Sequence, residues 1–128
     1  AYVWDYADGM EMIRLFWEAA AALDPAAAEQ DEGRRFPLCR PEPLRELWGE
    51  AGLTGVEVAP VAVATRFRGL DDYWSPFLGG QGPAPAYVSS LGEEQRAALY
   101  ELLRERLPVA ADGSISLSAR AWAVRGCR

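Results

Sequence analysis

The stretch AYVWDYADGMEMIRLFWEAAAALDP, residues 1–25, decides the fold, because it predicts a strand that leads directly into a helix. Residues 1–7 are largely β-branched and aromatic without strict alternation, which is typical of a strand buried on both faces in a parallel sheet. Apolar side chains then recur at three- and four-residue spacing, which predicts an amphipathic helix ended by Asp24-Pro25. Asp8 is expected to cap this helix, and Glu11, three positions on, would complete a capping box.

The middle of the chain predicts a second helix and a long strand. Residues 26–39 are mixed and charged, and they are interpreted as a connector. Pro41 suits the first turn of the helix, which is expected to end at Gly52 in a Schellman cap. Residues 55–67, GVEVAPVAVATRF, predict one strand at a sheet edge, with a bulge or bend at Pro60, where the alternation changes phase.

The last third of the chain predicts helices and then a final strand. A short helix is expected over residues 69–78, followed by a Gly/Pro loop over 79–86. Ser90 is expected to open a stronger helix, which Pro108 stops. Residues 114–125 alternate apolar and polar side chains and predict the last strand. The predicted order is therefore β-α-α-β-α-α-β in a single α/β domain.

The composition excludes several classes of function. The chain has 128 residues, and its 13 basic residues, all of them Arg, are outnumbered by 19 acidic residues, for a formal net charge of −6. The absence of His excludes an imidazole general base and a His-ligated metal. The absence of Lys excludes a Schiff base and a P-loop lysine. The acidic balance argues against nucleic acid as a partner.

Neither a metal, a disulfide nor a membrane is expected. Asp71 and Asp72 are adjacent, so on a helix their side chains would diverge by about 100° and could not form a metal pair. Cys39 and Cys127 are too few for a disulfide scaffold and are expected to be reduced thiols. No apolar run reaches the length of a membrane span. These features suit a cytoplasmic protein.

Three segments carry a resemblance to a known family. They are AYVWDY at residues 1–6, FPLCRPEPLRELWGEAGLTGVEV at residues 36–58 and SARAWAVRG at residues 118–126. Together they resemble the C-terminal half of a class I S-adenosylmethionine-dependent methyltransferase, and the resemblance covers nearly the whole chain. The family's pattern in the second segment is matched by Phe36, Pro41, Leu44, Leu47, Ala51, Gly52 and Leu53, with an offset in the spacing from Phe to Pro.

The resemblance implies a fold and a role. The fold would be the C-terminal part of a three-layer, Rossmann-like sheet, with about three strands, an antiparallel last strand and four or five helices. Residues 1–128 would be the substrate side of the parent enzyme, with a lid-like helical insertion at about 69–108. The family's motifs for S-adenosylmethionine lie upstream of such a segment, so no cofactor-binding residue is assigned. The segment alone would bind no cofactor and would be inactive.

Asp5 and Tyr6 are the first candidates for binding the substrate. Ligands of open α/β sheets bind beyond the carboxyl ends of the strands, and these two residues end the first predicted strand. Asp5 could orient or deprotonate the hydroxyl or amine of a methyl acceptor, and Tyr6 could wall the pocket. The alternative for Asp5 is an ordinary strand-end carboxylate that leads into the helix cap at Asp8.

The second group of candidates lies in the insertion. Tyr73, Trp74 and Phe77 share one side of the short helix, and Gln81 lies in the Gly-Gly-Gln-Gly-Pro loop that follows. The resemblance implies that this insertion covers a small-molecule methyl acceptor, for which aromatic side chains and a glycine hinge are suited. The alternative is a helix that packs in the core, followed by a solvent-exposed loop.

The first strand also bears on the partners of the chain. Three short strands are few for so many apolar helices, so we expect further strands of the same sheet upstream of Ala1. In the segment alone the first strand would present an unpaired edge, and we expect a homodimer or another association through it. The alternative is an independent, non-catalytic α+β module that binds a small ligand or dimerises.

Overall fold

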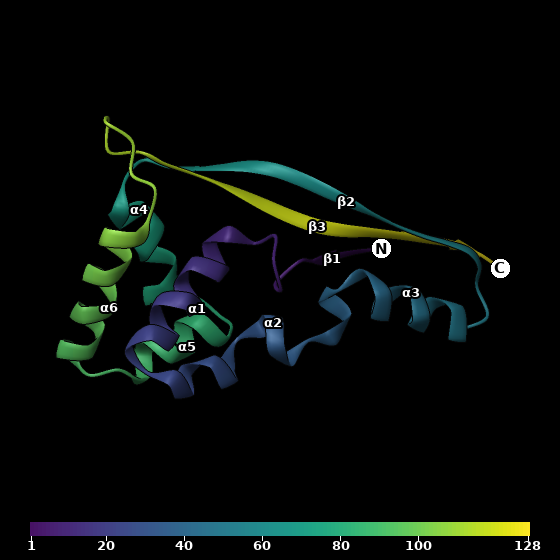
Figure 1. Ribbon diagram of the computed structural model, residues 1–128, viewed down its shortest axis with the longest axis horizontal. Coiled ribbons are helices and arrows are strands. Elements are labelled where there is room, and N and C mark those ends of the chain that lie inside the picture. The colour runs from purple at the N-terminus through teal and green to yellow at the C-terminus, as the bar shows by residue number, and fades with distance from the viewer.

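The computed structural model describes residues 1–128 as a three-stranded sheet that lies across a layer of helices (Figure 1). The strand order is β1-β3-β2, and both pairs are antiparallel. The strands are β1 (Tyr2–Trp4), β2 (Thr54–Phe67) and β3 (Ile115–Cys127). The α-helices are α1 (Glu11–Leu23), α2 (Glu32–Arg35), α3 (Pro41–Glu50), α4 (Leu70–Trp74), α5 (Pro83–Ser90) and α6 (Glu93–Arg106). Three 3-10 helices are interspersed: η1 (Pro25–Gln30), η2 (Pro37–Cys39) and η3 (Ser75–Leu78).

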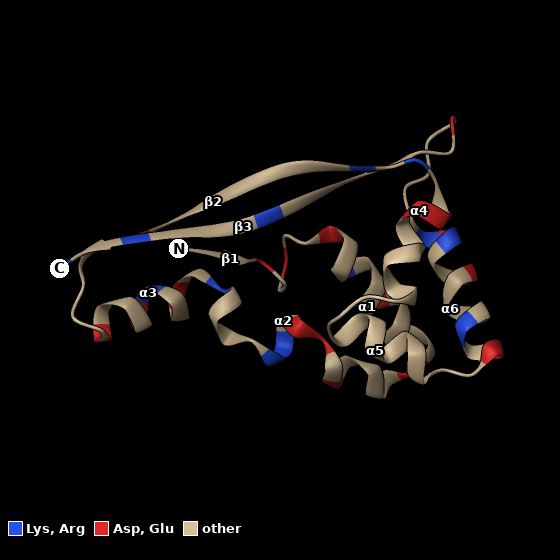
Figure 2. Ribbon diagram, turned by 180° about the vertical axis from the view of Figure 1, so that it is seen from behind, with Lys and Arg blue, Asp and Glu red and all other residues tan.

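The mixed α/β class, the three strands and the antiparallel last strand are confirmed. The number of helices is higher than predicted, because α2 forms inside the predicted connector and α5 begins inside the predicted Gly/Pro loop. In the front and back views the helices lie on one side of the sheet, so these residues form two layers rather than three (Figures 1 and 2).

The predicted bulge at Pro60 is wrong, and the strand pairing explains why. Pro60 lies opposite Trp122 in a register that runs without interruption from Glu57 to Phe67. In an antiparallel ladder the backbone groups of successive residues point alternately to either neighbour, and those of Trp122 point toward β1. The nitrogen of Pro60 therefore faces the free edge of β2, where no hydrogen bond is lost. The irregularity lies instead between Thr54 and Glu57.

The change of phase along β2 reflects twist. Near its start, Val56 and Val58 are the half-buried side chains, whereas near its end Thr65 and Phe67 are. These pairs lie on opposite faces of the strand, because successive side chains alternate. A long two-stranded ribbon twists strongly. Because of this twist, the face of β2 that carries Val56 and Val58 is turned toward the helices near α3. The opposite face, which carries Thr65 and Phe67, is turned toward the helices at the core.

β1 is not buried on both faces, and it pairs antiparallel rather than in a parallel sheet, contrary to the prediction. Its three residues pair only with β3, and the side chains of Tyr2 and Trp4 are 75% and 46% exposed. The aromatic and β-branched composition of this segment therefore does not mean that its side chains are buried within residues 1–128. These side chains share a face with Val61 and Val63 of β2, which are also exposed.

Two predicted helix caps are also wrong. α1 begins at Glu11 after Met10, without a side-chain cap, and it is Asp5 whose Oδ1 accepts the N–H of Asp8. Ser90 ends α5 rather than opening α6, and its hydroxyl donates to the carbonyl of Tyr87. By contrast, α3 begins at Pro41 and ends in the predicted Schellman cap. There Gly52 has φ +82°, and the N–H of Leu53 donates to the carbonyl of Trp48.

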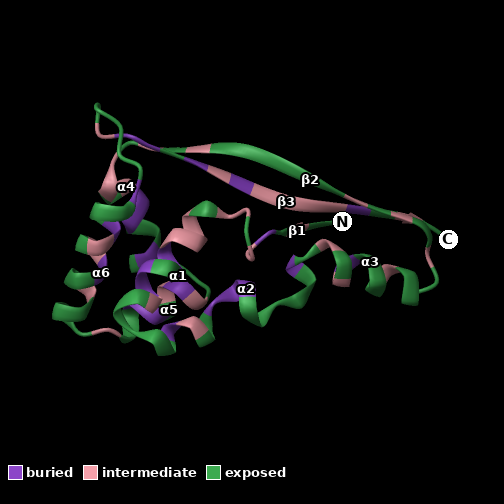
Figure 3. Cartoon of the chain, in the orientation of Figure 1, coloured by how far each residue is buried: buried purple, intermediate pink, exposed green.

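The core lies at one end of the ribbon, where α1 packs against α5, α6 and the start of β3 (Figure 3). It is a cluster of 16 buried residues. Phe16 stacks on Phe77 with 4.5 Å between ring centroids, and Trp17 meets Phe16 edge-on at 5.0 Å. Ile115 and Leu117 of β3 close the cluster from the sheet. Trp17 is 1% exposed and belongs to this cluster.

Candidate functional site

A cavity of about 430 Å³ opens at the carboxyl end of β1. One wall is formed by the end of β1 and the start of α1, with Trp4, Tyr6 and Met10. The facing wall is formed by Phe77 and by the loop between η3 and α5, which includes Gln81. The volume lies within the range that small-molecule sites occupy.

Three of the six predicted site residues meet in this cavity. Tyr6 is more than 70 positions from Phe77 and Gln81 along the chain, yet all three line the cavity. Tyr6 extends the strand end, and its ring lies 6.4 Å from that of Phe36. Burial, followed by the neighbouring Glu32 carboxylate and Cys39, raises the pKa of the Tyr6 phenol, which therefore stays protonated at neutral pH.

Asp5 lies beside the cavity but is bound by the protein itself. Its carboxylate is 1% exposed and pairs with Arg120 of β3, with 2.7 Å from Arg120 Nε to Asp5 Oδ2. Its other oxygen accepts the N–H of Asp8, and its carbonyl accepts the N–H groups of Gly9 and Met10. These contacts match the alternative in which Asp5 is a strand-end carboxylate that shapes the turn into α1.

Tyr73 and Trp74 also lie outside the cavity. The ring of Tyr73 is fully buried, and its hydroxyl donates to the carbonyl of Met12 at 2.7 Å. Burial raises the pKa of this phenol strongly. Trp74 packs against Phe77 and edge-on against Tyr100 of α6. These two side chains thus fit the core-helix alternative, whereas Phe77 faces both the core and the cavity.

Glycines shape the loop that covers the cavity. A Cβ on Gly80 would lie 2.8 Å from the carbonyl oxygen of Pro76, so the loop turns back on η3 at a distance that only glycine allows. Gly82 has φ +111°, a conformation that side chains disfavour. The two glycines thereby place Gln81 and the prolines that follow them over the cavity.

Glu32 is the one charged side chain in the cavity lining, and sequence reasoning missed it. It is the first residue of α2, inside the segment that was interpreted as a connector, and it is 6% exposed. The indole N–H of Trp17 donates to its Oε2. A signal for a structured turn was present in the sequence Asp31-Glu32-Gly33, because Asp frequently accepts the N–H two residues on. That signal does not reveal which cavity the middle residue faces.

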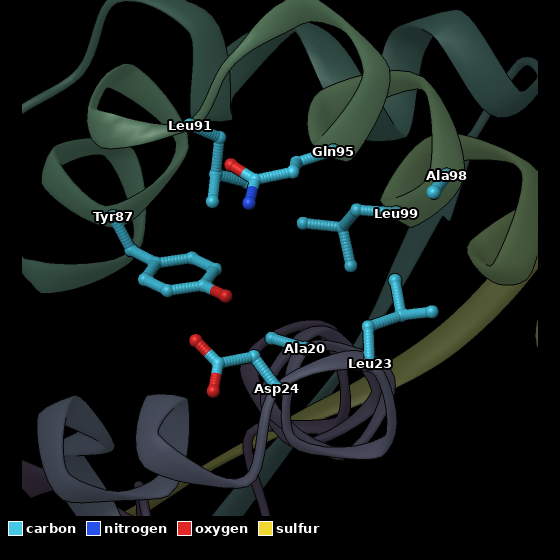
Figure 4. A pocket seen from close by; sticks show the side chains of 8 residues that line it. All are labelled: Ala20, Leu23, Asp24, Tyr87, Leu91, Gln95, Ala98 and Leu99. Atoms are coloured by element: carbon cyan, nitrogen blue, oxygen red, sulfur yellow. The ribbon is translucent and has the colours of Figure 1, made fainter.

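A second cavity of about 200 Å³ lies between the end of α1 and the helices α5 and α6. Figure 4 shows the hydroxyl of Tyr87 directed toward the carboxylate of Asp24, with Gln95 on the opposite wall. Burial and then Asp24 raise the pKa of the Tyr87 phenol. This cavity lies away from the end of β1 and contains none of the predicted site residues.

The remaining candidate chemistry is sparse. No group of three or more Cys, Asp or Glu side chains is arranged to hold a metal ion. Cys39 is buried, and burial raises the pKa of its thiol, whereas Cys127 is exposed; both are free cysteines. β1 and the middle of β2 carry no charged residue, and most charges lie on the helices and at the ribbon ends (Figure 2).

Compared with known proteins, the sequence matches no family model and no curated protein. None of the helices combines the length and the apolar character needed to cross a bilayer.

Proposed function

We propose that residues 1–128 are the acceptor side of an S-adenosylmethionine-dependent methyltransferase, in which they complete the sheet and form the pocket for a small-molecule methyl acceptor. The observation that carries this proposal is the cavity at the carboxyl end of β1, covered by the loop between η3 and α5. In the open, mostly parallel sheet that we propose for the parent protein, substrates bind at that end of the strands. The parent protein would be a cytoplasmic, Rossmann-like transferase, and residues 1–128 alone would be inactive.

The free edge of β1 supports a sheet that continues in the parent protein. Ala1 and Asp5 bond to β3 through their backbones, so alternation directs the N–H of Tyr2 and of Trp4 away from it. The outer edge of β2, by contrast, includes Pro60, which has no N–H to offer an incoming strand. In the parent enzyme a strand of the cofactor-binding half would pair with β1. In residues 1–128 alone, a second copy would pair there and form a homodimer.

The turn after β1 does not fit the cofactor. A Cβ on Gly9 would lie 2.5 Å from the Cβ of Arg120 and 2.7 Å from Oδ2 of Asp5. Because Gly9 has no Cβ, the Asp5–Arg120 ion pair can occupy the adjacent space, so this glycine accommodates a contact within the protein rather than a ligand. The glycine cluster at residues 79–82 follows a helix rather than a strand, and it borders the acceptor cavity. We assign S-adenosylmethionine, which would supply the methyl group, to another part of the parent protein.

Within this proposal the cavity holds and orients the acceptor. Met10, Phe36 and Phe77 surround its apolar part and exclude water. The protonated Tyr6 hydroxyl and the Gln81 amide offer hydrogen bonds that fix its orientation. Alignment of the two reactants is the main contribution a protein makes to a one-step displacement. No general base is assigned.

A non-catalytic α+β module that binds a small ligand is the second candidate function. The observation that favours it is the cluster of 16 buried residues, which residues 1–128 complete without another chain. Such a module would use the same cavity but would need neither a cofactor nor a further strand at β1.

Calorimetric titration of the natural protein with S-adenosylmethionine separates these functions. We expect one cofactor to bind per chain when the reading frame upstream of Ala1 encodes a glycine-rich strand-turn-helix. Residues 1–128 expressed alone are the matched control and should give no heat of binding. A start codon close to Ala1, or a natural protein that binds no cofactor, overturns the methyltransferase and leaves the binding module.

A further inference from the structure

We propose that the cavity at the end of β1 binds an apolar amine in its protonated form, with Glu32 as the partner of the ammonium group. This inference rests on the proposed function and names the chemical class of its acceptor. The ammonium group is the form that binds, and it must lose a proton, to Glu32 or to water, before methyl transfer, because only the free amine has the lone pair that takes the methyl group. The buried carboxylates of the protein differ in one respect, which is whether a cation is paired with them.

Three carboxylates of the protein are buried: those of Asp5, Asp31 and Glu32. Asp5 pairs with Arg120, and Asp31 forms two hydrogen bonds with the guanidinium of Arg14. Glu32 takes part in no ion pair. Since buried charges in proteins are normally paired, the missing cation is the feature that requires an explanation.

The position of Glu32 is fixed by its neighbours on both sides. Asp31 caps α2 by accepting the N–H of Gly33 at 2.8 Å, while Arg14 of α1 holds the same carboxylate. A Cβ on Gly33 would lie 2.7 Å from the carbonyl oxygen of Tyr6, so the start of α2 is pressed against the end of β1. Glu32 is therefore held beside the strand end whether or not a ligand is present.

The carboxylate itself is held by one oxygen. The indole N–H of Trp17 donates to Oε2, and no protein group donates to Oε1. Trp17 belongs to the buried core, so its ring cannot turn away without disrupting its edge-on contact with Phe16. Oε1 is thus left to accept a hydrogen bond from a molecule in the cavity.

The rest of the cavity selects against anions. No Arg side chain lines it, and its other polar side chains, Tyr6, Gln81 and the indole of Trp4, are neutral donors or acceptors. An anionic ligand would bring a second negative charge close to Glu32 with no cation to offset the repulsion. An ammonium group supplies the missing charge and forms a charge-assisted hydrogen bond, which is stronger than one from a neutral hydroxyl.

Three probes with the same apolar body and different head groups test the proposal: phenylbutylamine, phenylbutanol and phenylbutyrate. Each is titrated into the ¹⁵N-labelled full chain, and binding is followed through the amide resonances of Gly80, Gly82 and Ala84 beside the cavity. We expect the amine to bind about tenfold more tightly than the alcohol, and the carboxylate to bind more weakly than both.

Two variants assign the preference to Glu32. Glu32→Gln keeps an oxygen that can accept the N–H of Trp17 but loses the charge, so the amine should lose about tenfold in affinity while the alcohol changes less than about twofold. Glu29→Gln is the matched control, because it removes one negative charge from an exposed position in η1, three residues away. It should leave all three affinities unchanged.

Several results overturn the proposal. They are equal binding of amine and alcohol by the unmodified chain, no binding of any probe at millimolar concentration, or an equal effect of Glu29→Gln and Glu32→Gln. The first two depend on no variant, so a Glu32→Gln chain that does not fold leaves the test intact. S-adenosylmethionine is absent throughout. Failure here therefore leaves the methyltransferase standing, and failure of cofactor binding leaves the amine site standing.

Discussion

The two ends of the β2–β3 ribbon are packed very differently. At the end near Phe67 and Ile115, the ribbon lies on the core cluster of 16 buried residues. At the end near Thr54 and Cys127, it lies on the single helix α3, of which only Leu44 is buried. Between the ends, the side chains of Tyr2 and Trp4 of β1 and of Val61 and Val63 of β2 are exposed. Stability is thus concentrated at one end, and the surface beside β1 is left available for binding.

Truncation of the core should give the largest loss of stability. Phe16→Ala removes a fully buried ring that contacts Phe77, Trp17 and Tyr87, and we expect a loss of about 3–5 kcal/mol in the free energy of unfolding. Val63→Ala, on the exposed middle of the ribbon, should cost less than about 0.5 kcal/mol. Urea unfolding followed by circular dichroism measures both. Similar losses would show that the two regions share the stability of the fold.

Two ion pairs on β3 extend the comparison to charges. Asp5→Asn breaks the buried pair with Arg120, whose guanidinium also lies over the ring of Trp122, with 4.9 Å from Cζ to the ring centroid. We expect a loss of about 2 kcal/mol. Glu57→Gln breaks the exposed pair with Arg125 and should cost less than about 0.5 kcal/mol. The same urea titrations decide, and equal losses would contradict a structural role for Asp5.

The core should also make the protein sensitive to alkali. Because the folded pKa of Tyr73 is raised by burial, its contribution to stability is full below the unfolded pKa of about 10 and is lost as the pH rises through the folded value. Tyr73→Phe should cost about 1 kcal/mol at neutral pH through the lost hydrogen bond to Met12, and should flatten the fall in stability above about pH 10. Urea midpoints measured across this pH range test it.

Tyr2→Phe is the control for that pH series, because Tyr2 is largely exposed. The free energy of unfolding of Tyr2→Phe should fall with pH above about 10 as steeply as that of the unmodified chain. If the two variants show the same slope, the buried phenol is not the source of the alkaline loss.

Local patterns predicted the parts of the fold that depend on nearby residues. The spacing of Phe16 and Trp17 marks one face of α1, and the Gly52-Leu53 pair marks the end of α3. The exposure of Tyr2 and Trp4 could not be predicted, because it depends on which strands lie beside β1. The outward nitrogen of Pro60 could not be predicted either, because it follows from a register with Trp122, 62 positions away.

The candidate site was also predicted only in part, because local patterns identify single residues but not the distant segments that surround them. The sequence predicts Tyr6 at a strand end and Phe77 and Gln81 in a segment that covers the substrate, and the fold brings all three to one cavity. Glu32 was missed because its environment is made by α1 and the end of β1, which are distant in sequence. The sequence of its segment shows charge and glycine but not the cavity that the charge faces.

We propose that β1 is an interior strand of a larger sheet in the parent protein. Amide hydrogen exchange of Tyr2 and Trp4 tests it most directly, because their N–H groups point away from β3. In the natural protein, at a concentration where it is monomeric, both amides should exchange slowly, as in a paired central strand. Fast exchange at both positions, alongside slow exchange at Val3, would mean that the sheet ends at β1 and would contradict the account.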